Sequence, residues 1–122
     1  MANVDKVLVF LDDERNIDDV TWIQYPIQYD EVKVFRTFNQ FMNFCKNTNL
    51  VNVDFSFDHD IQDFVDGVEK TGYDCVKCLF DLAFDGLTAI DLKKSNIVVH
   101  SQNPVGRQNI MSYTNNAIKY LE

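Results

Sequence analysis

Short runs of hydrophobic residues alternate along the chain with segments in which hydrophobic residues recur every three or four positions. The runs are rich in β-branched and aromatic residues, which is typical of buried strands, and they cover residues 6–11, 31–36, 51–57 and 96–99. Helical spacing covers residues 38–46, 73–85 and 104–121. Strands that alternate with helices predict an α/β fold with an open parallel sheet and right-handed crossovers.

Residues with known capping preferences stand at the ends of the predicted helices. Thr37 is suited to be the N-cap of the first helix, and Gln40 follows three residues later, as in a capping box. Gly86 is suited to end the second helix, because glycine tolerates a left-handed backbone. Pro104 stands at the first position of the third helix, where its missing N–H is not needed. These residues support the predicted boundaries.

Three segments have no sustained periodicity. Residues 16–30 contain acids, Pro26 and the only tryptophan, Trp22, which we expect to cover the core. Residues 61–71 are polar and are predicted to form a loop. Residues 87–95 could hold a helical turn or a weak extended piece. The fold of these segments is not predicted further.

Length, charge and cysteine content narrow the class of protein. The 122 residues, 46% of them hydrophobic, fit a single domain over residues 1–122 with one core. A formal net charge of -8 argues against binding duplex DNA by bulk electrostatics, although local donors could still hold a small phosphate. No apolar run is as long as a membrane span and no signal peptide is recognisable, so we expect a cytoplasmic protein without a membrane partner. Cys75 and Cys78 form a CxxC pattern inside an apolar helix, where we expect structural cysteines rather than a zinc or redox site.

A short polar cluster follows three of the four predicted strands. Residues 12–15 follow the first strand, residues 58–60 the third and residues 100–104 the fourth. The carboxyl ends of parallel strands share one edge of a sheet, so the three clusters are expected to meet there. Both histidines of the chain lie in these clusters. This coincidence favours a shared site.

The carboxylates of these clusters fit metal or acid–base chemistry. Asp12, Asp13 and Asp58 could hold Mg²⁺ or Mn²⁺, because hard cations of this kind bind a few carboxylate oxygens and keep several waters. The same groups could transfer protons, since crowded like charges raise one of their pKa values. The simpler alternative is that they cap helices and solvate turns.

The remaining polar residues of the clusters add a possible base and possible phosphate contacts. His59 lies between two acids, and a neighbouring carboxylate favours the imidazolium form, although single histidines are usually structural. His100 and Ser101 could act as base and hydrogen-bond donor; Ser101 is disfavoured as a nucleophile because the nucleophile-elbow glycines are missing.

An anion could bind at the start of the last predicted helix. Asn103, Gly106 and the free backbone N–H groups there form a cradle of the kind that holds phosphate. Two of the three arginines, Arg15 and Arg107, lie at the same edge and are suited to bidentate phosphate contacts. Surface salt bridges are the alternative for both.

Together these motifs resemble the response-regulator receiver fold and, more closely, the cyclic-phosphate processing receiver-like family of bacteria and phages. The resemblance spans nearly the whole chain, and its motifs are residues 11–15, 57–60, 72–74 and 100–111. The His-Ser-x-Asn-Pro-x-Gly-Arg stretch, residues 100–107, is the most specific of them. The resemblance implies a single flavodoxin-like or receiver-like domain with helices on both faces of the sheet.

The resemblance also implies roles for individual residues. Asp12, Asp13 and Asp58 would line an acidic, metal-binding pocket. The family's additional polar set would be His59, Asp60, His100, Ser101, Asn103 and Arg107, together with Arg15.

The chain departs from the ordinary receiver pattern in three places. Receivers carry a lysine at the end of the last strand, where His100 and Ser101 stand here, and a Ser or Thr after the fourth strand, which has no clear counterpart. Gln62 stands where the family pattern has a glycine. The missing lysine disfavours aspartyl-phosphate signalling.

These observations leave three functional hypotheses in order of preference. The first is a metal-assisted phosphoesterase that acts on a cyclic phosphate, a nucleotide-like phosphoester or an RNA end. In this hypothesis Asp58, Asp60, Ser101 and either histidine would be the catalytic groups, and Arg107 with the helix N-terminus would stabilise phosphoryl charge. The second is a non-catalytic protein, phage or bacterial, that binds a phosphorylated ligand or a host protein in the host cytoplasm. The third is a phospho-accepting receiver.

Overall fold

The computed structural model describes residues 6–121, and within them four parallel strands form one sheet in the order β2-β1-β3-β6. The strands are β1 (Val7–Leu11), β2 (Glu31–Phe35), β3 (Val53–Phe57) and β6 (Ile97–Val99). The main helices are α1 (Phe38–Asn47), α2 (Gly72–Phe84) and α3 (Pro104–Ile118). The predicted open parallel α/β sheet with a receiver-like fold is confirmed.

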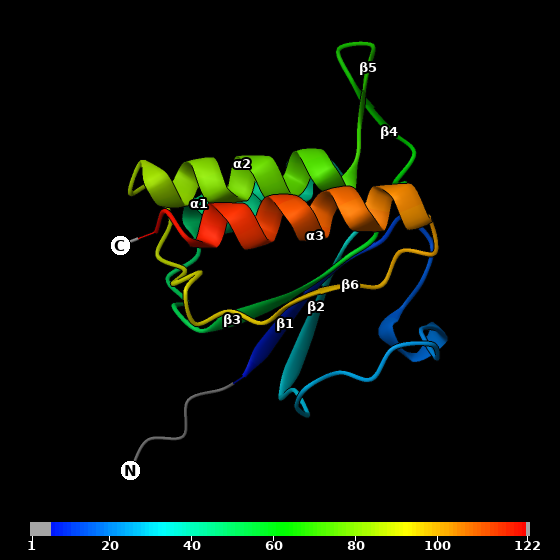
Figure 1. Ribbon diagram of the computed structural model, residues 1–122, viewed down its shortest axis with the longest axis horizontal. Coiled ribbons are helices and arrows are strands. Elements are labelled where there is room, and N and C mark those ends of the chain that lie inside the picture. Colours follow the sequence, from blue (N-terminus) through cyan, green and yellow to red (C-terminus); the bar gives the residue numbers. More distant parts are fainter. Residues whose placement is uncertain (1–5, 122) are drawn as a thin grey trace.

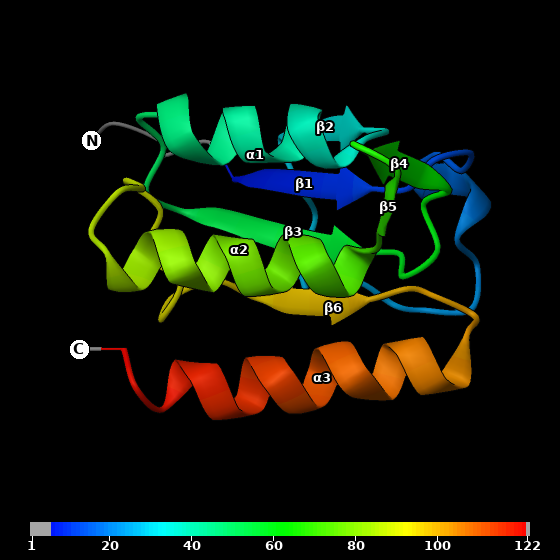
Figure 2. The ribbon, with the colours of Figure 1, turned by 90° about the horizontal axis from the view of Figure 1, so that it is seen from above.

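All three of these helices lie on the same face of the sheet, side by side, with α2 between α1 and α3 (Figures 1 and 2). The expectation of helices on both faces is therefore wrong for the part of the chain that the structure describes. The opposite face is covered by residues 20–30, which we call the strap. The strap follows a single 3-10 turn, Ile17–Asp19.

The direction of the crossovers explains why the first connection differs from the others. The chain moves from β1 to β2 toward one edge of the sheet, and from β2 to β3 and from β3 to β6 toward the other edge. Right-handed crossovers that run in opposite directions lie on opposite faces. Residues 12–30 lack helical periodicity, so the face that they cover receives an irregular segment instead of a helix.

The helix face of the sheet carries the apolar core. Side chains alternate between the faces along a strand, and Val9, Leu11, Phe55 and Phe57 point to this side. They form one buried cluster with residues of α1, α2 and α3, among them Phe41, Cys45, Cys75, Leu79, Phe80 and Ile110. Burial of this apolar surface is the main force that holds the helices to the sheet.

The strap face has a different composition. Leu8 and Phe10 of β1 point to this side, but β3 contributes Asp54 and Ser56, both with no exposed surface. Two tyrosines of the strap bond these groups: Tyr29 donates to Asp54 at 2.8 Å, and the hydroxyls of Tyr25 and Ser56 lie 2.8 Å apart. Hydrogen bonds therefore hold the strap to the sheet.

Trp22 of the strap does not cover the core as expected. Its side chain is 40% exposed, and its indole N–H donates to the backbone oxygen of His100 at 2.9 Å. The indole thus anchors the strap at the carboxyl edge of the sheet through a polar contact.

A β-hairpin replaces the loop that was predicted for residues 61–71. It consists of β4 (Asp63–Val65) and β5 (Val68–Lys70) and projects from the body of the molecule (Figure 1). Asp66 and Gly67 have φ angles of 52° and 79°, the left-handed values that a tight two-residue hairpin turn requires. An Asp-Gly pair next to Val65 and Val68 is a hairpin signal, and the expectation of a polar loop overlooked it.

Residues 87–95 form neither a helix nor a strand, yet Ile90 and Leu92 are buried in the apolar cluster. Cys75 belongs to the same cluster and Cys78 packs against it, as expected of structural cysteines, and Cys45 of α1 is buried there too. Burial raises the pKa of the Cys45 thiol to about 12, so this thiol stays protonated and unreactive near neutral pH.

None of the described helices combines the length and the apolar character needed to cross a membrane.

Candidate functional site

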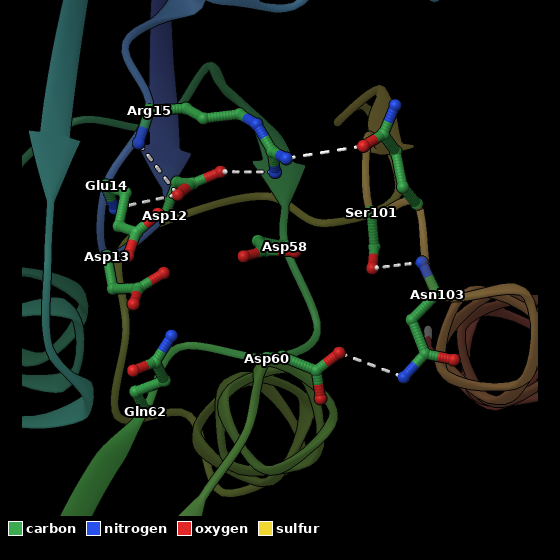
Figure 3. A pocket seen from close by; sticks show the side chains of 10 residues that line it. Asp12, Asp13, Glu14, Arg15, Asp58, Asp60, Gln62, Ser101 and Asn103 are labelled. Atoms are coloured by element: carbon green, nitrogen blue, oxygen red, sulfur yellow. Dashed lines mark hydrogen bonds and ion pairs between the residues drawn. The ribbon is translucent and has the colours of Figure 1, made fainter.

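The polar clusters meet at the carboxyl edge of the sheet, where the strand order reverses between β1 and β3. This is the position at which open α/β sheets usually bind ligands. A pocket of about 220 Å³ lies there (Figure 3). It is lined by Asp12, Asp13, Glu14, Arg15, Asp58, Asp60, Gln62, Ser101, Gln102 and Asn103.

Asp12 is the most constrained carboxylate of the pocket. It is 1% exposed, and its Oδ1 accepts hydrogen bonds from the backbone N–H groups of Glu14 and Arg15, both at 2.9 Å. Its Oδ2 lies 3.0 Å from Nε2 of His100. Burial raises the pKa of Asp12, but the bonds from His100, Arg15 and Glu14 outweigh burial and hold that pKa below its usual value. Asp12 is therefore an ionised acceptor with a fixed orientation.

Asp58 lies beside Asp12 in the centre of the pocket (Figure 3). Its backbone N–H donates to Leu11 at 2.9 Å, which ties the end of β3 to the end of β1. Burial raises the pKa of Asp58, and the charge of Asp12 raises it further. Asp13 is less buried, and its pKa is raised by burial and by the charges of Asp12 and Glu14. The pocket thus concentrates negative charge that lacks full compensation.

A glycine lets the next helix come close to Asp58. A Cβ atom at Gly72, the first residue of α2, would collide with the backbone carbonyl of Asp58. The N–H of Gly72 also donates to the backbone oxygen of His59 at 2.7 Å. Only glycine fits this close approach, which gives the Gly-Tyr-Asp motif at residues 72–74 a structural reason.

His100 lies behind the pocket rather than in its wall. Its side chain has no exposed surface and stacks on Phe10, with ring centroids 4.4 Å apart and planes 4° from parallel. Nδ1 lies 2.7 Å from the hydroxyl of Ser56, and Nε2 faces Asp12. Both ring nitrogens are occupied. The expectation that His100 contacts a substrate as acid or base does not fit this geometry.

His59 is also outside the pocket wall, while its neighbour Asp60 lines the pocket. Nδ1 of His59 lies 2.9 Å from one oxygen of Asp60, and the side-chain amide of Asn103 donates to the other oxygen at 2.9 Å. These bonds from Asn103 and His59 lower the pKa of Asp60. The His59 ring packs on α3, where a Cβ atom at Gly106 would collide with it. Here His59 orients Asp60.

The start of α3 does not form an open anion cradle. The N–H of Gly106 donates to the side chain of Asn103 at 3.0 Å, so the N-cap already uses this donor. Gly106 itself is buried under His59. Arg107 is exposed and is not among the residues that line the pocket. The structure does not bring Gly106 and Arg107 to the phosphate-binding position expected for them.

Arg15 and Ser101, two of the donors expected from the sequence, do line the pocket. Arg15 reaches across the pocket to the side-chain oxygen of Gln102 at 3.3 Å and lies 3.8 Å from Asp12 (Figure 3). Its guanidinium also lies over the indole of Trp22, 5.2 Å from the ring centroid. Ser101 is 5% exposed, and its hydroxyl accepts from the backbone N–H of Asn103 at 3.2 Å.

Three further residues support the site, although no sequence pattern singles them out. Arg36 donates to the backbone oxygens of Asp12 and Arg15, at 3.1 and 2.6 Å, and so fixes the loop after β1. Ser56 and Tyr25 bond in series behind His100. Ser56 is a polar residue inside a buried strand, and this was the one signal that pointed to it.

The three deepest groups have the spacing of a possible metal centre. Asp12, Asp58 and His100 each offer a ligand atom, and these atoms lie within 4.8 Å of one another. Since Nε2 of His100 is bonded to Asp12, the carboxylates are the better ligands. Carboxylate oxygens fit Mg²⁺ or Mn²⁺, and the open side of the pocket leaves room for the waters that such ions retain.

Residues 7–116 match the family described as the cyclic-phosphate processing receiver domain. This chain belongs to that family. No curated protein and no solved structure matches the chain closely enough to be compared with it. Membership of the cyclic-phosphate processing receiver family agrees with the sheet, with the acidic pocket at its switch point and with the polar residues that follow β6.

The sheet order changes how the chain aligns with an ordinary receiver. His100 and Ser101 were assigned to the end of the last receiver strand, but β6 lies next to β3 and is therefore the fourth strand of the sheet. Ser101 is thus the second residue after the fourth strand, close to the position where receivers carry a Ser or Thr. Among the described residues no fifth strand carries a lysine, and no lysine lines the pocket. The cation that faces the carboxylates in this member of the family is Arg15.

Proposed function

We propose that this protein is a metal-assisted phosphoesterase that acts on a cyclic phosphate or a related nucleotide phosphoester. The observation that carries the proposal is the pair of buried carboxylates, Asp12 and Asp58, which face one small pocket together with Arg15 and Ser101. Two buried carboxylates repel each other, and a divalent cation between them would remove that repulsion.

The donor set fits Mg²⁺ or Mn²⁺, with Asp12, Asp13 and Asp58 as the residues that would hold the ion. When bound, such an ion polarises a phosphoryl oxygen and lowers the pKa of a coordinated water. The raised pKa values of Asp13 and Asp58 are consistent with a site built for positive charge, because a cation favours their ionised form.

The residues of the chain itself supply binding and proton transfer in this proposal. Arg15 and the hydroxyl of Ser101 hold the phosphoryl oxygens, and fixed donors of this kind stabilise the charge that develops there. Asp60 accepts the proton of the attacking water, because it lines the pocket and its bonds to His59 and Asn103 keep it ionised. The water oxygen bonds to phosphorus as the bond from phosphorus to a sugar oxygen breaks, and Asp60 returns the proton to that oxygen. The two histidines act through their carboxylate partners.

The size of the pocket restricts the part of the substrate that it encloses. Its volume of about 220 Å³ is below the range of roughly 300–1,000 Å³ that is usual for sites of drug-sized ligands. A phosphate and the edge of a sugar fit such a space, whereas a whole nucleotide does not. The remainder of the substrate would lie outside, as expected for a nucleotide or an RNA end that presents its phosphate.

A hydrolysis assay on a panel of 2′,3′-cyclic nucleotides, with Mg²⁺ or Mn²⁺, tests the proposal. We expect turnover that Asp58→Asn and Asp12→Asn each reduce at least a hundredfold. Asp81→Asn makes the same chemical change at an exposed position of α2 and should have no effect. No turnover of any substrate, or turnover that Asp58→Asn leaves intact, would contradict the proposal.

One observation favours a second function, the binding of a phosphorylated ligand without hydrolysis. Both histidines, the usual acid–base groups near neutral pH, lie outside the pocket wall. Calorimetry with the same cyclic nucleotides separates the two functions. Tight binding that depends on Arg15, without product formation over hours, would favour the binding protein.

Beryllofluoride in place of nucleotides tests the phospho-accepting receiver, for which chemical shifts around Asp58 should change.

A further inference from the structure

A series of hydrogen bonds runs from the strap, through the sheet, to the pocket. The hydroxyl of Tyr25 lies 2.8 Å from that of Ser56, which lies 2.7 Å from Nδ1 of His100. Nε2 of His100 lies 3.0 Å from Oδ2 of Asp12. The Ser56 and His100 side chains have no exposed surface, so water does not compete for these bonds.

The donors and acceptors of the side chains determine the direction of the bond between His100 and Asp12. Asp12 is an ionised carboxylate and can only accept, so Nε2 of His100 must carry a hydrogen. The hydroxyl of Ser56 bonds Nδ1 on the other side of the ring, and the hydroxyl of Tyr25 bonds Ser56 in turn. Every group in the series therefore has a partner, and the ring cannot turn away from Asp12 without breaking its bond to Ser56.

The bond from His100 also determines which atom of Asp12 is free. Oδ1 already accepts two backbone N–H groups at 2.9 Å, which uses both of its lone pairs. Oδ2 accepts one bond from His100 and keeps one lone pair on the pocket side, where Nη1 of Arg15 lies 3.8 Å away. The carboxylate of Asp12 can therefore offer a ligand in the pocket through Oδ2 only.

We propose that Ser56 and Tyr25 are positioning residues that hold the His100 ring with its Nε2–H on Oδ2 of Asp12, and that this bond directs the remaining lone pair of Asp12 into the pocket. The inference rests on the proposed function only where it makes Asp12 a ligand of the cation. Side-chain packing alone does not require the hydroxyl of Ser56, since alanine or valine would also fill a buried strand position. What the hydroxyl of Ser56 adds is its bond to the imidazole of His100.

Nitrogen-15 NMR of the histidine rings, with Mn²⁺ binding measured in parallel by calorimetry, tests the proposal at neutral pH. The His59→Gln variant assigns the signals of the remaining histidine. In the unmodified protein we expect the ring shifts of His100 to show a hydrogen on Nε2. In Ser56→Ala we expect a mixture of tautomers and a loss of Mn²⁺ affinity of about 10-fold, the low end of the effect of removing a group that supports a metal ligand, because Ser56 acts on Asp12 through His100.

The strap offers a matched pair of control variants. Tyr25→Phe removes the last hydroxyl of the series, and we expect a small shift of the His100 signals and about a twofold loss of Mn²⁺ affinity. Tyr29→Phe makes the same change four residues later, where the hydroxyl bonds Asp54 instead, and should leave both measurements unchanged. This pair preserves the test if Ser56→Ala does not fold.

An Nδ1–H tautomer of His100 in the unmodified protein, which would leave Nε2 without a hydrogen for Asp12, would overturn the proposal. Equal effects of Tyr25→Phe and Tyr29→Phe would also overturn it, because both would then act through general stability. A locked Nε2–H tautomer in a protein that binds no Mn²⁺ would support the assignment of Ser56 and His100 while it contradicts the proposed metal-assisted function.

Discussion

The two faces of the sheet are made by the same strands, but they are covered by different kinds of interaction. On the helix face, Phe55 and Phe57 of β3 pack in an apolar cluster with three helices. On the strap face, Asp54 and Ser56 of the same strand bond to tyrosines of an irregular segment. Adjacent positions of β3 therefore alternate between apolar and polar burial.

Apolar burial on one face and buried hydrogen bonds on the other contribute differently to the stability of the fold and to the geometry of the site. Apolar burial is non-directional, and its free energy grows with the area removed from water. Buried hydrogen bonds contribute less on average, but they fix orientation, and removal of one partner leaves the other unsatisfied. The face that holds hydrogen bonds is the one that connects to Asp12 through His100. We expect the helix face to provide most of the stability and the strap face to orient the site.

Truncation of an aromatic residue on the helix face should have the largest effect on folding. Phe55→Ala removes a fully buried ring that contacts Phe41 and Phe57, and it should lower the free energy of unfolding by about 4 kcal/mol. Urea denaturation measures this loss. If the variant folds, its ligand or Mn²⁺ affinity should stay within a factor of two. A loss below 1 kcal/mol would mean that the helix face is not the main source of stability.

Removal of the buried carboxylate on the strap face should have the next largest effect. Asp54 accepts bonds from Tyr29 and Asn96 and pairs with Lys6 at 3.2 Å. Asp54→Ala leaves these donors without their partner and should cost about 3 kcal/mol in urea denaturation. Asp54→Asn keeps an acceptor and should cost less. Equal losses in the two variants would show that cavity formation, rather than the unpaired donors, causes the effect.

Stability on the strap face should depend on pH through Asp54. Burial raises the pKa of Asp54, but its bonds to Asn96, Tyr29 and Lys6 outweigh burial and hold that pKa below its usual value. A folded-state pKa below the unfolded value of about 3.9 adds stability above pH 4, and this stability is lost as the pH falls further. The advantage of the unmodified protein over Asp54→Asn should therefore shrink between pH 6 and pH 3. A constant difference over that range would argue against an ionised Asp54.

Removal of a single strap hydroxyl should have the smallest effect. Tyr29→Phe deletes one hydrogen bond to Asp54, which keeps its bonds from Asn96 and Lys6. We expect a loss of about 1 kcal/mol in urea denaturation. A loss as large as that of Asp54→Ala would mean that Tyr29 alone holds the strap, and the view of a strap with several anchors would be wrong.

Much of the site could be predicted because it lies at strand ends. Asp12 and Asp58 directly follow a hydrophobic run, Ser101 follows one after His100, and parallel strands bring their carboxyl ends to one edge whatever the loops do. Arg107 is expected at the same edge because it stands in the first turn of the helix that follows. It lies on the first turn of α3, and the rotation of that helix turns it to solvent.

Other features depended on contacts between distant residues. Ser56 bonds His100 from 44 positions away, and Arg36 fixes the loop at Asp12 from 24 positions away. No local pattern marks such pairs. The strap was equally hidden, since irregular segments have no periodicity and Tyr25 and Tyr29 acquire their roles only on the sheet.

The sequence by itself determined the order of strands and helices, the capped ends of the helices and the polar residues that follow the strands, because these depend on interactions between near neighbours. The tertiary structure alone decided which face each connection covers and which histidine nitrogen meets which carboxylate. It also decided that both histidines lie outside the pocket wall. Those outcomes follow from the handedness of crossovers and from hydrogen bonds between strands, and both require the chain to be folded.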